Sequence, residues 1–96
     1  SGGIRHGSEA AKALALGARA VAVAGPVLVR HQREGRTGAR AYLEGLLADL
    51  RAAVLLCGAR TLADLQRRPV VITGFVGEWC RLRGVDVAAL ANRWEP

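Results

Sequence analysis

The sequence has few aromatic residues, few cysteines and no obvious metal-ligand cluster. It contains one Phe, one Tyr, two Trp and two Cys in 96 residues. Cys57 and Cys80 form no CxxC motif, and no Cys or His pair has the short spacing of zinc ligands, so the sequence predicts no metal site. Both cysteines lie in apolar helical contexts, and we expect them to be buried free thiols in a reducing cytoplasm.

Apolar residues are abundant but form no long uninterrupted run. No segment is long and apolar enough to cross a bilayer, and none has the charged-then-apolar pattern of a secretory signal, so we expect no membrane association. The apolar fraction is nevertheless 51%, which excludes a disordered tail. Much of that fraction is alanine, so a chain of this size would be only marginally stable by itself.

Acidic residues are outnumbered by basic ones, which gives a net charge of +6. The basic residues are scattered, and Arg67-Arg68 is the only adjacent pair. This pattern is typical of a solvated arginine-rich surface, and the alternative is affinity for phosphate in a nucleic acid or a small molecule. Aromatic residues do not alternate with the basic ones as they do in single-strand binders, so we expect no nucleic-acid partner.

The first third of the chain predicts a loop, a helix and a strand in succession. Residues 1–7 form a glycine-containing loop, and we expect Ser8 to cap a helix that Gly17 ends. The apolar run AVAVA, residues 20–24, suits a strand that is covered on both faces, as in a parallel sheet. Together these elements make half of a βαβ unit.

The longest helix is expected from Ala39 to Cys57, after a short connector over residues 26–33 that has some helical character. Arg40 and Glu44 form an exposed i,i+4 pair on its polar side, and Gly58 ends it. Its apolar residues share one face. That face consists of Ala39, Leu43, Leu46, Leu47, Leu50, Ala53, Val54 and Cys57.

Short helices follow in the last third of the chain. Thr61 and Asp64 resemble a capping box at the start of a brief helix. A second helix is expected to start at Thr73 or Gly74, after an extended lead-in. Asp86 then caps a last helical turn or two.

Only one strand is predicted with any strength, over residues 20–24. A single strand of the parallel type cannot pair with itself. We therefore expect the chain to be incomplete, with a further strand directly before Ser1, or to associate with another chain.

Two small-residue sites are expected to lie side by side. Gly2 and Gly3 follow the place where that preceding strand would end, and Ala24 and Gly25 follow the strand that is predicted. Neighbouring strands of a parallel barrel are about 4.8 Å apart. Backbone N–H groups of both loops and of the helix after the first loop would then converge, as in the phosphate site after the last two strands of such barrels. Arg5 would add a charge-assisted contact.

These glycines taken alone indicate turns as readily as ligand contacts. The sequence has no GxGxxG motif and no Walker-type loop. His6 is interpreted as a solvated loop histidine. No pair of titratable residues forms a catalytic arrangement, so no catalytic residue is predicted in this segment.

Two longer stretches carry a family resemblance. SGGIRHGSEAAKALALGARAVAVAGP resembles the segment from the seventh to the eighth strand of FMN-dependent (β/α)8 enzymes. GARTLADLQRRPVVITGFVGEWCRLRGVD resembles the C-terminal region of the type II isopentenyl-diphosphate isomerases, with their VITG turn and WxxxRG helix end. The two stretches together cover nearly the whole chain.

The resemblance implies an α/β fold. The chain would be the C-terminal portion of a TIM (β/α)8 barrel, about the last two βα units plus a helical C-terminal extension, and would itself be mostly α-helical. Residues 1–58 would belong to the FMN-binding barrel, and residues 59–96 would form the extension packed on it. The rest of the barrel would then be its partner.

The resemblance also implies an activity. Family members interconvert isopentenyl and dimethylallyl diphosphate with reduced FMN, NADPH as the flavin reductant, and Mg²⁺, and we expect a homo-oligomer. The FMN-phosphate contacts of the family map onto Gly2, Gly3 and Ile4, with Arg5 beside them, and then onto the Ala24-Gly25 pair. Many flavin barrels have Gly-Arg in place of that pair, so the backbone contacts are kept here while a side-chain contact is lost.

Two other interpretations remain open. The chain would also fit a part of another FMN-dependent (β/α)8 dehydrogenase or oxidase, because the first stretch is shared by the whole superfamily. A free-standing basic helical module that binds a partner is the other alternative, and it predicts cooperative unfolding of the isolated chain and salt-sensitive association.

Overall fold

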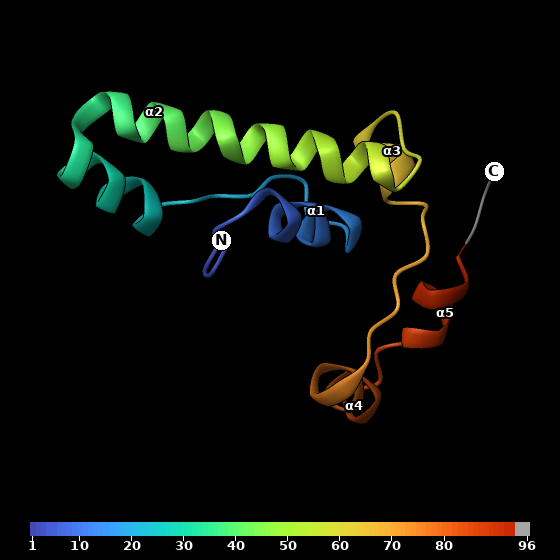
Figure 1. Ribbon diagram of the computed structural model, residues 1–96. Coiled ribbons are helices and arrows are strands. Elements are labelled where there is room, and N and C mark those ends of the chain that lie inside the picture. The colour runs from blue at the N-terminus through green and yellow to red at the C-terminus, as the bar shows by residue number, and fades with distance from the viewer. Residues whose placement is uncertain (94–96) are drawn as a thin grey trace.

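The computed structural model describes residues 1–93, which form five helices joined by irregular segments. In chain order these are α1 (Gly7–Ala15), α2 (Gly25–Leu56), α3 (Leu62–Leu65), α4 (Gly74–Leu82) and α5 (Val87–Asn92). Figure 1 shows α1 lying along the long α2, with α4 and α5 set apart from both. The last residues of the expected extension, 94–96, lie outside the described part.

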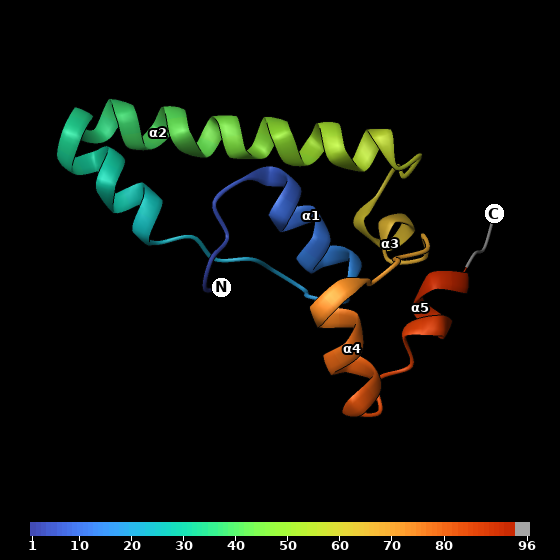
Figure 2. The ribbon, with the colours of Figure 1, turned by 60° about the horizontal axis from the view of Figure 1, so that its bottom comes forward.

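The strand predicted over residues 20–24 is absent from the structure. No strand occurs anywhere in residues 1–93, and residues 20–24 form an irregular link from α1 to α2 (Figure 2). The physical reason is that a strand exists through its ladder of hydrogen bonds to a neighbour, which no segment of the described chain supplies. The described residues therefore show no part of the predicted barrel sheet.

The helix α1 begins earlier than its sequence predicts. His6 rather than Ser8 is the residue before the helix, because the Glu9 carboxylate accepts hydrogen bonds from the backbone N–H groups of Arg5 and His6, at 2.9 and 3.1 Å. The predicted end at Gly17 is confirmed, since its N–H donates to the carbonyl of Leu14 in a helix-ending turn.

The helix α2 is longer than predicted, because it takes in residues 26–33. The expected connector is helical, and the two helical pieces meet at a kink at Gly35, where φ is +70°. Glycine reaches this conformation without the steric cost that a side chain would bring, so the chain turns sharply while helix continues on both sides. Pro26 is compatible with the first turn of α2 because that turn needs no N–H donor there.

The core lies between α1, the second half of α2 and α3. It consists of Leu14, Ala15, Ala59 and Leu65, with Val21, Leu50, Val54 and Val70 packed against it. The apolar face predicted for residues 39–57 is only partly used. Leu46 is buried, whereas Leu43 and Leu47 are about half exposed, at 42% and 48%.

Backbone contact between α1 and α2 is closest at Gly7. A Cβ atom there would lie 2.3 Å from the Leu50 nitrogen and 2.6 Å from the Leu46 oxygen. Only a residue without a side chain allows the two helices to approach this closely. The start of α1 is therefore fixed against the middle of α2.

The short helices follow the predicted caps. The Thr61 hydroxyl accepts a hydrogen bond from the Asp64 N–H at 3.1 Å, and the Asp64 carboxylate accepts one from the Arg60 N–H at 3.1 Å. The Asp86 carboxylate accepts one from the Ala89 N–H at 2.9 Å. The helix α4 begins at Gly74, one of its two predicted starts.

The prediction for the cysteines is right for one and wrong for the other. Cys80 is buried, but Cys57 is exposed and neither forms a disulfide. Cys57 directly follows the last turn of α2. In residues 1–93, no helix is both long and apolar enough to cross a membrane.

A candidate phosphate-binding cavity

The two small-residue sites predicted from the sequence line one cavity. Residues 1–5 and residues 22–26 enclose a volume of about 300 Å³. Figure 2 shows the N-terminal segment beside the link that leads into α2. All six residues predicted to contact the cofactor line this cavity: Gly2, Gly3, Ile4, Arg5, Ala24 and Gly25.

The glycine pair presents bare backbone to the cavity. Gly2 and Gly3 have φ values of +80° and +96°, a region that side chains disfavour, and no atom lies within 4 Å of where a Cβ would be. Glycine is required here for the conformation of the backbone rather than for lack of space. Successive backbone N–H groups in such a loop are suited to anion binding.

The start of α2 forms the opposite wall of the cavity. Gly25 is the first residue of α2, and the first helical hydrogen bond runs from the Leu28 N–H to the Ala24 carbonyl at 3.0 Å. The N–H groups of a first helical turn have no acceptor within the helix, and the helix dipole gives this end a partial positive charge. The combination favours an anion, above all a phosphate group.

The start of α1 does not line the cavity, contrary to the prediction. The N–H groups of Arg5 and His6 are already bonded to the Glu9 carboxylate. The pKa of Glu9 lies below its usual value, and the largest cause is the hydrogen bond from the Arg5 N–H. The helix that faces the cavity is α2 instead. Pro26 directly after Gly25 is typical of a first helical turn, a signal in the sequence that could have indicated this start.

The walls carry charge of only one sign. Arg5 is the single charged side chain among the lining residues. A site made of backbone N–H groups and one guanidinium is chemically suited to a phosphate and offers no general acid or base. Its volume is at the lower end of the range for small-ligand sites, so it suits one end of a cofactor rather than a whole one.

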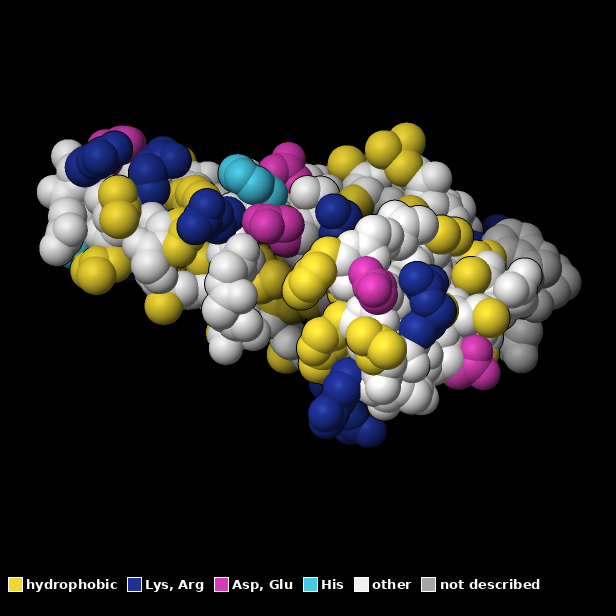
Figure 3. All heavy atoms as spheres, turned by 90° about the horizontal axis from the view of Figure 1, so that it is seen from below, with side chains coloured by type: hydrophobic (Ala, Val, Ile, Leu, Met, Phe, Trp, Pro, Cys, Tyr) yellow, Lys and Arg dark blue, Asp and Glu magenta, His cyan; other side chains and the backbone are white. Residues whose placement is uncertain are grey.

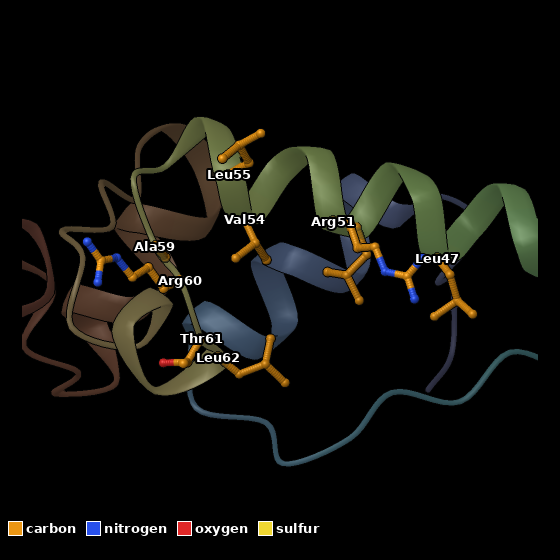
Figure 4. Close-up of a pocket in the computed structure, with 9 residues that line it drawn as sticks. Leu47, Arg51, Val54, Leu55, Ala59, Arg60, Thr61 and Leu62 are labelled. Atoms are coloured by element: carbon orange, nitrogen blue, oxygen red, sulfur yellow. The ribbon is translucent and has the colours of Figure 1, made fainter.

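Two larger hollows lie elsewhere and are mainly apolar. One, of about 610 Å³, lies between α2 and residues 59–62, and Figure 4 shows Leu47, Val54 and Leu62 at its walls. The other, of about 650 Å³, lies between α1, the end of α2 and residues 68–73. Neither is lined by an acidic side chain.

Basic side chains do not collect into one surface patch on the face drawn in Figure 3, where they alternate with apolar and acidic ones. Among residues 1–93, no three His, Cys, Asp or Glu side chains are grouped so that they would hold a metal ion.

Comparison with known proteins identifies a family that matches this chain. Residues 1–72 match the family described as FMN-dependent dehydrogenase. An isopentenyl-diphosphate delta-isomerase of Symbiobacterium thermophilum is 72% identical over 95 residues, which is 99% of this chain and 26% of that protein. Isomerases of the same name from Nocardia farcinica and Methanothermobacter thermautotrophicus are each 46% identical, over 100% and 97% of this chain and 27% and 26% of their own lengths.

These matches confirm the resemblance inferred from the two sequence stretches. The chain spans about a quarter of the length of the curated relatives it matches. The family match covers residues 1–5 and 22–26, so the cavity lies wholly within it. The chain belongs to the family of FMN-dependent dehydrogenases.

Proposed function

We propose that this chain is part of an isomerase that interconverts isopentenyl and dimethylallyl diphosphate, and that its cavity holds the phosphate of FMN. The observation that carries the proposal is the meeting of residues 1–5, residues 22–26 and the start of α2 around one cavity. The names of the similar proteins support the choice of substrates. In the complete enzyme, the chain would form the last two βα units of a (β/α)8 barrel and an extension packed on it.

The residues of the cavity would divide the work of binding. The backbone at Gly2, Gly3 and Ile4 would donate hydrogen bonds from one side, and the start of α2 at Gly25 would donate from the other. Arg5 would add a positive charge at the rim. Ala24 is small enough to leave the backbone accessible. FMN, when bound and reduced, supplies the proton-transfer chemistry of the isomerisation, and this chain would anchor its phosphate.

Other parts of the proposal assign no residue of this chain. We propose NADPH as the reductant of the flavin, Mg²⁺ as the metal, a homo-oligomer as the assembly, and the cytoplasm as the location. The ligands of Mg²⁺ and of the substrate diphosphate would come from outside this segment, because the described residues bring no acidic cluster to the cavity.

A flavin titration of the complete protein tests the phosphate site. Gly25→Asp introduces a carboxylate at the first position of α2, where acidic residues are favourable for the helix itself. Repulsion between this carboxylate and the phosphate is expected to raise the Kd of FMN about 100-fold. The Kd of riboflavin, which lacks the phosphate, should stay the same.

Gly3→Asp should act in the same direction, with Gly17→Asp as its control. Gly17 has a similar positive φ of +112° and equally open space, but it lies outside the cavity. The two substitutions therefore bring similar backbone strain and the same charge. Unchanged FMN affinity in both Gly3→Asp and Gly25→Asp would refute the phosphate site.

A second candidate function follows from the family description. Residues 1–72 match a family named for dehydrogenases, so the chain would also fit an FMN-dependent dehydrogenase or oxidase. Incubation of the complete protein with isopentenyl diphosphate and reduced flavin separates the two candidates. Formation of dimethylallyl diphosphate supports the isomerase, and its absence, with FMN bound, supports the dehydrogenase or oxidase.

A further inference from the structure

Tyr42 connects the two walls of the cavity without lining it. Its hydroxyl donates a hydrogen bond to the backbone carbonyl of Arg5, 37 positions away in the chain. Its ring lies under the guanidinium of Arg30, which is 5.9 Å from the ring centroid. One side chain thus contacts the loop of residues 1–5 and the first half of α2.

We propose that Tyr42 is a positioning residue that holds these two walls in the geometry for binding a phosphate. The inference rests on the proposed function, because the phosphate is that of FMN. Tyr42 would act through the backbone of the glycine loop and through the angle of α2, and it would not touch the cofactor.

The loop side of this arrangement needs an anchor. Gly2 and Gly3 have more conformational freedom than other residues, and that freedom is lost when a ligand orders the loop. The Tyr42 hydroxyl fixes the Arg5 peptide, two residues beyond this pair, and the close contact at Gly7 fixes the start of α1. A loop held in its binding conformation before the ligand arrives binds more tightly.

The helix side needs an anchor for a different reason. The halves of α2 meet at Gly35, whose backbone is not helical, so regular helical hydrogen bonding does not set the angle between them. Arg30 belongs to the half that starts at the cavity, and Tyr42 belongs to the half that packs on α1. Their cation–π contact spans the kink. Glu34 holds Arg30 in place through an ion pair at 3.1 Å.

Single-atom deletion in the complete protein separates this role from a general structural one. Tyr42→Phe removes the hydroxyl and keeps the ring that Arg30 covers, whereas Tyr42→Ala removes both. Loss of one hydrogen bond to the loop is expected to raise the Kd of FMN about 3- to 10-fold. Tyr42→Ala should raise it further, and Arg40→Gln, in the same helix but paired only with Glu44, should leave it unchanged.

Riboflavin gives the readout that a structural role would not produce. The Kd of riboflavin should be equal in wild type, Tyr42→Phe and Tyr42→Ala, because only the phosphate meets the loop. The ³¹P resonance of bound FMN should shift in Tyr42→Phe, since the groups around the phosphate move. Thermal unfolding of the apoprotein measures any change in stability separately.

Each result decides the inference. Unchanged FMN affinity and an unchanged ³¹P signal in Tyr42→Phe would overturn it, and so would an equal loss of affinity for FMN and riboflavin. Failure of the proposed phosphate site looks different, because wild type itself would then bind FMN no better than riboflavin. In that case the phosphate site and the role of Tyr42 fall together.

Discussion

The contacts that stabilise residues 1–58 differ in kind from those that stabilise residues 59–93. In the first region, α1 and α2 meet backbone to backbone at Gly7. In the second, Phe75 and Leu82 of α4 are each 81% exposed, and α5 has no buried residue. Close packing therefore shapes the part that carries the cavity, whereas the second region adds only Ala59, Leu65 and Val70 to that core and is otherwise attached through directed hydrogen bonds.

Those hydrogen bonds converge on the C-terminal ends of α1 and α2. Gln66 donates to the carbonyls of Leu14 and Ala18 at 3.0 and 3.2 Å, and Arg93 donates to the carbonyl of Ala15. Arg68 donates to the carbonyls of Cys57 and Gly58, at 3.1 and 2.7 Å. The last carbonyls of a helix have no partner within it, and cations are favourable at this end. The second region therefore caps the first.

The largest effect on stability is expected from disrupting the close packing of α1 on α2. Gly7→Ala places a methyl group against the backbone of Leu46 and Leu50, which cannot rotate away. We expect the free energy of unfolding of the complete protein to fall by about 3 kcal/mol. Chemical denaturation measures it.

Gly45→Ala is the matched control for this substitution. Gly45 also lies in a helix, but no atom is within 4 Å of its Cβ position. Replacing it should raise stability by up to about 1 kcal/mol through helix propensity. Equal effects of the two substitutions would show that the contact at Gly7 does not constrain the fold.

A smaller effect is expected from breaking the cap on α2. Arg68→Ala leaves the carbonyls of Cys57 and Gly58 without their guanidinium donor, at a cost of about 1–2 kcal/mol. It should also speed proteolytic cleavage after residue 59. Arg67→Ala, its neighbour, removes only a partly exposed pair with Asp64 and should cost less. A larger loss of stability in Arg67→Ala than in Arg68→Ala would contradict this expectation.

The smallest effect on stability is expected at the start of α3, and this effect depends on pH. The pKa of Asp64 lies below its usual value of 3.8, and the largest cause is the hydrogen bond from the Arg60 N–H. The charge of Arg67 and the hydrogen bonds from Thr61 lower it further. A lowered pKa means that the folded state prefers the ionised carboxylate, so its contribution is complete above that value and is lost as pH falls through the folded pKa.

Asp64→Asn should therefore reduce stability near neutral pH and flatten its decline in acid. Thermal unfolding at neutral and acidic pH measures both. Glu44→Gln is the control, because Glu44 makes only an exposed pair with Arg40. If the stability of Asp64→Asn falls as steeply in acid as that of wild type, the Asp64 carboxylate is not the source of this pH dependence.

Local signals in the sequence predicted several boundaries correctly. The ends of helices at Gly17 and Gly58 and the caps at Thr61 and Asp86 depend on residues within four positions of each other. The full extent of α2 was not predicted, because glycines such as Gly35 and Gly38 are typical of breaks between helices. Gly38 in fact lies inside the helix, where a Cβ would come within 2.4 Å of the Glu34 side chain.

Non-local features were harder to predict. The juxtaposition of residues 1–5 and 22–26 was expected from parallel strand pairing, and the structure brings them together without a strand. The contact of Tyr42 with Arg5 had no signal, because nothing in a lone tyrosine on a helix indicates which carbonyl it will meet.

The local sequence is enough to place the ends of α1 and α2, the caps of α3 and α5, and the small residues that leave backbone exposed. Those properties follow from φ preferences and from hydrogen bonds between near neighbours. Three other features depend on the folded chain: α2 rather than α1 faces the cavity, α2 continues across Gly35, and Tyr42 reaches both walls. Each of these depends on contacts between residues distant in the chain, whose free energy is set by packing rather than by local propensity.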